Sequence, residues 1–245
     1  MSAAGLRTGL RFSKRTVIEA FRMHGEKYSE QRAWNVEYHA ELLARAKKGW
    51  AQETCNEDFR HVYLELRNHW QVFRPVKQPP SAERVWGLLS RINRECQTLK
   101  LSELKNAHSR EVKKALAVGG KLKATADGPS LMAASKFLHF WNPRLFVIVD
   151  RKVMSEYVLQ HAWIKNSIAA LCGRSFEPDY DHYLDFLTWC SALVRESPFI
   201  LEAFRAYLKR NIRNRRHRAV VQDCEAAAIE WFLLGVVELP PAQIR

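Results

Sequence analysis

The sequence predicts an all-α fold, because apolar residues recur at helical spacing and strand-like alternation is missing over any useful length. The clearest apolar stripe consists of Val85, Leu88, Leu89, Ile92, Cys96 and Leu99. Proline and glycine separate the periodic segments, as they do at joints between helices. With 245 residues and 47% hydrophobic content, the chain is long enough for one sizeable domain or two small lobes around a cleft.

The helices can be placed in order from these patterns. Apolar periodicity predicts helices near 14–24, 30–47, 57–70, 102–117, 130–141, 151–171 and 199–210. The 85–99 stripe forms a further helix that begins at Ser81, since serine accepts hydrogen bonds from the free amides of a first turn. Similar stripes predict helices over 183–194 and 229–236. Residues 1–12 are expected to be loose.

Composition excludes several classes of protein. No apolar stretch approaches the length of a membrane span, and Met1–Lys14 lacks a secretory core, so we expect a soluble intracellular protein without membrane contact. The 5 cysteines are scattered without a C-x-x-C pair, which predicts reduced core residues. The 9 histidines show no metal-ligand pattern. We therefore expect no metal and no cofactor.

Charge points to a polyanionic partner. The net charge is +13, and seven of the fourteen residues from Arg205 to Arg218 are Lys or Arg. Such a run can also be a solvated helix face. A second basic cluster precedes the turn at Gly128 and consists of Lys113, Lys114, Lys121 and Lys123. Together the two clusters indicate a nucleic acid.

The segment from Gly128 to Arg151 carries the most informative carboxylate, Asp150. A small-residue turn and a helix lead to the strongly apolar run 146–149, which should be buried and extended. Asp150 follows this run directly and precedes a helix-compatible segment. Its simplest interpretation is a helix N-cap, because aspartate accepts hydrogen bonds from the first free amides.

The same segment resembles a known family. Gly128, the run Ala134–Leu138 and the run Ile148–Arg151 resemble the core of the helix-hairpin-helix DNA glycosylases, especially their small 8-oxoguanine-type branch. In that branch the pattern G-x-G-x-K-x-A-S-x-F-L precedes an apolar run that ends in Asp-Arg. The resemblance implies a single two-lobed helical domain over 13–245, with the hairpin and catalytic element at about 119–151.

The resemblance also implies site roles. Asp150 would be the catalytic carboxylate, and DNA with a flipped base would be the partner. Ser130 stands where the family has its second hairpin glycine, and Met132 stands where it has its Schiff-base lysine. A thioether cannot act as an amine nucleophile, which predicts hydrolysis without lyase activity. Lys136 lies one helical turn beyond Met132 and is a possible secondary site residue.

Other binding roles follow from residue type. We expect Met132, His139, Trp141 and Trp34 to be candidates for the base pocket, although most tryptophans should pack in the core. The expected contacts to the DNA backbone are Gly128, Ser130, Lys121, Lys123, Arg213, Arg215, Arg216 and Arg218.

The sequence thus predicts a monofunctional DNA glycosylase that excises a damaged or modified base, in repair or against modified foreign DNA. The alternative is a helical nucleic-acid-binding protein without catalysis, in which Asp150 is only a cap. A third possibility is an interaction protein whose basic run recognises an acidic partner.

Overall fold

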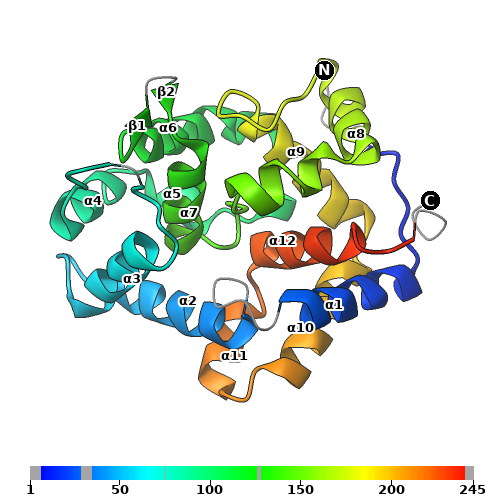
Figure 1. Cartoon of the computed structure of the whole chain (residues 1–245), viewed down its shortest axis with the longest axis horizontal. Coiled ribbons are helices and arrows are strands. Elements are labelled where there is room, and N and C mark those ends of the chain that lie inside the picture. The colour runs from blue at the N-terminus through cyan, green and yellow to red at the C-terminus, as the bar shows by residue number, and fades with distance from the viewer. Residues whose placement is uncertain (1–6, 29–34, 75, 126–127, 241–245) are drawn as a thin grey trace.

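Helices make up the architecture, which confirms the predicted all-α class (Figure 1). The computed structural model describes residues 7–28, 35–74, 76–125 and 128–240. The helices are α1 (Lys14–Tyr28), α2 (Val36–Trp50), α3 (Glu57–Asn68), α4 (Ala82–Leu89), α5 (Arg94–Thr98), α6 (Ser109–Gly120), α7 (Leu131–Trp141), α8 (Ala162–Cys172), α9 (Tyr183–Glu196), α10 (Phe199–Asn211), α11 (Arg215–Val221) and α12 (Glu225–Val236). Two short strands, β1 (Ala124–Thr125) and β2 (Gly128–Pro129), pair antiparallel.

Helix α12 is the centre of the packing. All its residues from Glu225 to Val236 are buried, because α1, α9 and α10 pack around it. Figure 1 shows it in the middle of the molecule, with α1 and α10 below. The crossing of α1 over α12 requires Gly235, since a Cβ there would lie 1.7 Å from the carbonyl oxygen of Ala20.

The region expected to form a hairpin lies between two helices in close contact. Helices α6 and α7 pack together, and a Cβ on Gly119 would lie 3.1 Å from the side chains of Ala134 and Leu138. The strands β1 and β2 belong to the connection between these helices. Ser130 then caps α7, since its Oγ accepts the N–H of Ala133 at 3.4 Å.

Two predicted helices are interrupted. The helix expected to begin at Ser81 ends at Leu89, and Asn93 starts α5 by accepting the N–H of Glu95 at 3.0 Å. The helix expected over 151–171 begins as a π-helical turn, Arg151–Ser155, and continues as α8 only from Ala162. Periodicity does not reveal such breaks, because the apolar stripe continues across them.

The first described residues are more ordered in the fold than expected. Residues 7–12 were predicted to be loose, but Thr8 donates from its hydroxyl to Glu196 at 2.6 Å and Phe12 is 6% exposed. Part of the basic run also forms a helix, α11, which Asn214 caps through the N–H of Arg216 at 2.9 Å. Within the described ranges, no helix combines the length and the apolarity that crossing a membrane requires.

Candidate functional site

The extended segment 146–149 positions Asp150. Its side chains are at most 2% exposed, yet in the described part of the chain it pairs with no strand. A buried backbone needs hydrogen-bond partners, and polar side chains supply them here. Ser135 on α7 accepts the N–H of Val149 through Oγ at 3.0 Å. This bond fixes the residue before Asp150 against α7.

Two further side chains donate hydrogen bonds to the backbone of the same segment. His139 on α7 donates from Nδ1 to the carbonyl of Phe146 at 2.7 Å. Tyr183 on α9 donates from its hydroxyl to the carbonyl of Val147 at 2.5 Å. The extended run is therefore held by side chains from two helices instead of by a sheet.

Asp150 is the N-cap of the π-helical turn, which confirms the capping interpretation. Its Oδ1 accepts the N–H of Val153 at 2.7 Å, and its main-chain oxygen accepts the N–H of Ser155 at 2.8 Å. The residue is half-buried. Among the described residues, only Oδ1 of this carboxylate receives a hydrogen bond, so its second oxygen is available to a ligand.

Lys136 is buried on α7, where its charge interacts with that of Asp150. Its Nζ donates to the carbonyl of Trp70 at 3.5 Å and lies 5.2 Å from the centre of the Trp70 ring. Burial lowers the pKa of Lys136, whereas the carboxylates of Asp150 and Glu230 oppose the shift. An amine is thus present near the predicted catalytic carboxylate, although Met132 occupies the family's lysine position.

Lys123 holds the loop that carries Trp70. Its Nζ donates to the carbonyls of Val72 at 3.0 Å and Arg74 at 2.5 Å. The side chain is 6% exposed, and burial lowers its pKa. Lys123 therefore stabilises this loop by hydrogen bonds within the protein. We had expected it to contact the DNA backbone instead.

Glu230 on α12 is the site residue that the sequence patterns missed. It is fully buried, and neither carboxylate oxygen has a hydrogen-bond partner among the described residues. Burial raises the pKa of Glu230 well above its usual range, and the nearby charge of Asp150 raises it further. The nearby backbone of Ile148, although not at hydrogen-bond geometry, and the ammonium of Lys136 favour the charged form but do not outweigh burial. The sequence does contain a signal for this residue, because Glu230 is a charged residue type that interrupts the apolar run 226–237.

Two buried histidines, His39 and His139, contact each other in defined tautomers. His139 donates from Nδ1, so the neutral ring must accept at Nε2, which lies 3.0 Å from Nε2 of His39. His39 consequently donates from Nε2 and has an unprotonated Nδ1, for which no partner exists in the described ranges. Burial lowers the pKa of His139 to about 4, and that of His39 also falls well below its usual range. Both rings are neutral at physiological pH.

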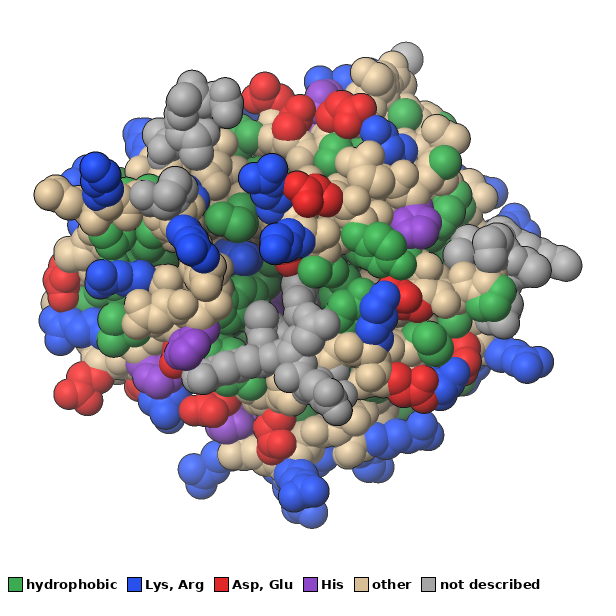
Figure 2. Space-filling model, in the orientation of Figure 1, with side chains coloured by type: hydrophobic (Ala, Val, Ile, Leu, Met, Phe, Trp, Pro, Cys, Tyr) green, Lys and Arg blue, Asp and Glu red, His purple; other side chains and the backbone are tan. Residues whose placement is uncertain are grey.

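Figure 2 shows a hollow near the centre of one face, with Lys and Arg side chains gathered beside it. In the same orientation, helices α2, α7 and α12 surround this position (Figure 1). The segments that adjoin Asp150 and Lys136 carry exposed basic residues: Arg74, Lys77, Lys121, Arg151 and Lys152. A polyanion would find complementary charge at this face.

The other predicted base-pocket residues do not gather at Asp150. His139 has no exposed surface, and Met132 is half-buried. Trp141 is 5% exposed and lines a different pocket, to which neither Asp150 nor Lys136 contributes. Trp34 lies outside the described residues.

The predicted backbone contacts fall into two separate groups. Gly128, Ser130 and Lys121 belong to the hairpin region, whereas Arg213, Arg215, Arg216 and Arg218 lie at α11. Figure 1 shows the hairpin at the upper left and α11 at the bottom of the molecule. Arg213, Arg215 and Arg216 are exposed. The guanidinium of Arg218 donates to the carbonyls of Lys209 at 3.4 Å and Ile212 at 3.3 Å, so it is already partly engaged.

Within the described ranges, no group of three or more His, Cys, Asp or Glu side chains is placed to hold a metal ion. No family model, curated protein or solved structure matches the chain. The resemblance to the glycosylases therefore depends on the residues of the 128–151 segment, with weaker similarity over 227–231.

The protonation of Glu230 predicts an unusual pH dependence of stability. Above the ordinary glutamate pKa of 4.5, the unfolded chain loses this proton while the folded protein keeps it, so stability falls as pH rises towards the folded pKa. Glutamine has no carboxyl proton to lose, so Glu230→Gln removes this fall in stability. In urea titrations, we expect the stability of the variant relative to wild type to rise between pH 4 and pH 8, by about 1.4 kcal/mol for each pH unit over which the folded protein alone keeps the proton.

The matched control is Glu53→Gln, at an exposed position. This variant should leave the unfolding free energy unchanged at pH 8 and at pH 4. A Glu230→Gln variant that is less stable than wild type at pH 8 would instead indicate an ionised Glu230 paired with Lys136.

Proposed function

We propose that this protein is a monofunctional DNA glycosylase, with Asp150 as its catalytic carboxylate. The observation that carries the proposal is the second oxygen of Asp150, which has no hydrogen-bond partner in the described ranges. This oxygen belongs to a half-buried carboxylate near the Lys136 ammonium, and exposed basic side chains lie on the segments that adjoin both residues. The family resemblance supplies the reaction class.

The reaction would proceed by displacement at C1′ of deoxyribose after the nucleotide flips out of the duplex. The N-glycosidic bond breaks with its electron pair leaving on the base, and positive charge develops on the sugar. Ionised Asp150 stabilises that charge and accepts a proton from the attacking water, whose oxygen forms the new bond to C1′. The hydrogen bond from Val153 holds the carboxylate in place.

The alternative is a nucleic-acid-binding protein without catalysis. The observation that favours it is the N-cap bond itself, because capping alone explains an aspartate at this position. Formation of abasic sites on a panel of duplexes with damaged and modified bases separates the two functions. A binder would retain affinity but release no base.

The variant Asp150→Asn tests the catalytic role directly. Asparagine caps helices as well as aspartate does, so the fold should be preserved while the charge is lost. We expect base release to fall on the order of 10²-fold or more, as when other transition-state charge stabilisers are removed. Single-turnover excision and DNA affinity are the measurements.

The control is Asp179→Asn, because Asp179 also accepts a backbone N–H, from His182 at 2.9 Å, but belongs to a different turn. This variant should excise at the wild-type rate. Excision by Asp150→Asn near the wild-type rate would remove Asp150 from the mechanism.

A second prediction concerns the strand after the base has left. Met132 offers no amine, and the Lys136 ammonium is buried against Trp70. We expect an intact abasic strand that breaks only after alkali or heat. Borohydride present during turnover should trap no protein–DNA adduct.

An adduct that forms in wild type and Lys121→Ala but disappears in Lys136→Ala would overturn the monofunctional assignment. It would show that Lys136 attacks C1′ as an amine and forms an imine, which borohydride reduces.

The salt dependence of DNA binding tests the role of α11. Each phosphate contact contributes about 0.9 to the slope of log affinity against log salt. Replacing Arg213, Arg215 and Arg216 by Gln should therefore reduce the slope by roughly three units. Arg218 is left in place because it bonds two carbonyls of the fold.

The control removes the same charge from exposed arginines elsewhere, at Arg91, Arg94 and Arg110. An equal change of slope in both triple variants would assign the effect to net charge rather than to contacts at α11.

A further inference from the structure

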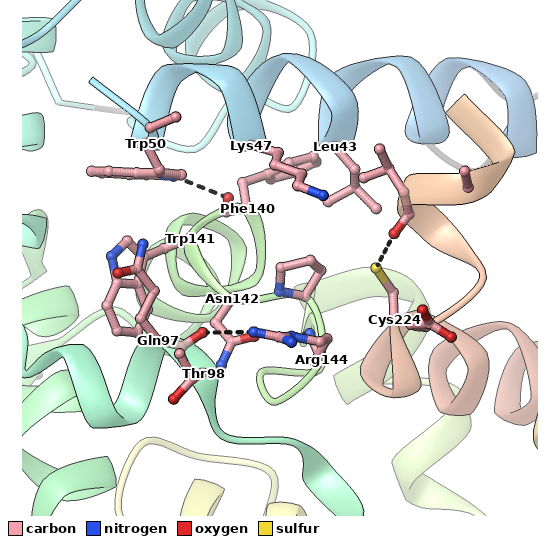
Figure 3. A pocket seen from close by; sticks show the side chains of 15 residues that line it. Leu43, Lys47, Trp50, Gln97, Thr98, Phe140, Trp141, Asn142, Arg144 and Cys224 are labelled. Carbon is pink, nitrogen blue, oxygen red and sulfur yellow. Dashed lines mark hydrogen bonds between the residues drawn. The ribbon is translucent and has the colours of Figure 1, made fainter. Parts of the chain in front are cut away.

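A second pocket lies away from the Asp150 cluster. It has a volume of about 390 Å³ and lies between α2, the residues that end and follow α7, and the chain from α11 to the start of α12 (Figure 3). None of Asp150, Lys136 and Glu230 lines it. A cavity of this size, with apolar walls and a few polar groups, is typical of a small-molecule site.

One side of this pocket is aromatic. Figure 3 shows Trp50 and Trp141 on the same side, with Phe140 close to Trp50. The indole of Trp50 is fixed, because its Nε1 donates to the carbonyl of Phe140 at 3.1 Å. Such rings offer a rigid surface to a planar apolar group.

Two cations complete the pocket. Lys47 projects from α2, and Arg144 belongs to the segment after α7 (Figure 3). Arg144 is oriented by one bond from Nη2 to the carbonyl of Gln97 at 3.2 Å. Within the described residues, neither Lys47 nor Arg144 pairs with a carboxylate.

The remaining titratable groups do not neutralise these cations. The Asp223 carboxylate, which also lines the pocket, already pairs with Arg205 at 3.3 Å. Burial raises the pKa of the Cys224 thiol to about 12, so this side chain is neutral. Lys47 is exposed and Arg144 is half-buried, so both cations are open to an anionic ligand that enters the pocket.

We propose that this pocket binds a mononucleotide unit, with its base against the aromatic side and its phosphate between Lys47 and Arg144. The ligand needs a planar ring and an anion, and a nucleotide has both. The charge of +13 and the basic run that leads into α11 favour a nucleotide over an aromatic carboxylate. The unit is either a free nucleoside monophosphate or the phosphorylated end of a strand. The proposal does not depend on catalysis by Asp150.

Isothermal titration calorimetry tests it with thymidine 5′-monophosphate, deoxyadenosine 5′-monophosphate, the matching nucleosides, inorganic phosphate and benzoate. We expect saturable binding of the monophosphates, at least 10-fold tighter than binding of any other probe. Lys47→Gln should weaken this binding at least 10-fold. Lys48→Gln, at the adjacent exposed lysine, should not change it.

Arg144→Gln should have the same effect as Lys47→Gln, with thermal unfolding confirming that the variant folds. Absence of monophosphate binding, equal binding of nucleoside or benzoate, or an unchanged affinity in Lys47→Gln would overturn the proposal.

Short single strands with and without a 5′-phosphate distinguish the two sources. Preference for the phosphorylated strand over the free monophosphate assigns the site to strand ends, and the reverse assigns it to free nucleotides. Wild-type affinity in Asp150→Asn would support the independence of this site from the proposed glycosylase reaction.

Discussion

The structure depends on the attachment of a buried extended segment to two helices by side-chain hydrogen bonds. Residues 146–149 cross the core, where unpaired amides and carbonyls would be costly. Ser135, His139 and Tyr183 provide the partners that a neighbouring strand would otherwise supply. Because the bond from Val149 to Ser135 is adjacent to Asp150, the same constraint that stabilises the core also determines where the carboxylate lies.

Charge balance in the site follows from burial. Lys136 brings one ammonium into the interior, and Asp150 and Glu230 bring two carboxyl groups. The half-buried Asp150 keeps a capping hydrogen bond, whereas Glu230 has no hydrogen-bond partner among the described residues. The proton therefore belongs on Glu230, whose neutral carboxyl group lies near the charges of Lys136 and Asp150. Unsatisfied buried carboxyl groups are uncommon in cores, and their presence points to function more than to stability.

Helix α7 connects the two places where a ligand is proposed. Its residues Ser135 and Lys136 belong to the Asp150 cluster, and its last residues, Phe140 and Trp141, line the pocket with Lys47 and Arg144. A nucleotide in the second pocket would thus contact the helix that positions the carboxylate.

The sequence alone determined the all-α class, most helix positions, the burial of the 146–149 run and the capping of Asp150, because each depends on neighbours within a few residues. The residue pattern from Gly128 to Arg151 also identified Asp150 and Lys136 as candidate site residues. Only the tertiary structure decided that Lys123 bonds a loop some fifty residues earlier in the chain, that His139 serves the backbone, and that Glu230 lies near Lys136. The contacts of Lys123 and Glu230 join segments far apart in sequence, and burial, which sets the protonation of these side chains, exists only once the helices have packed.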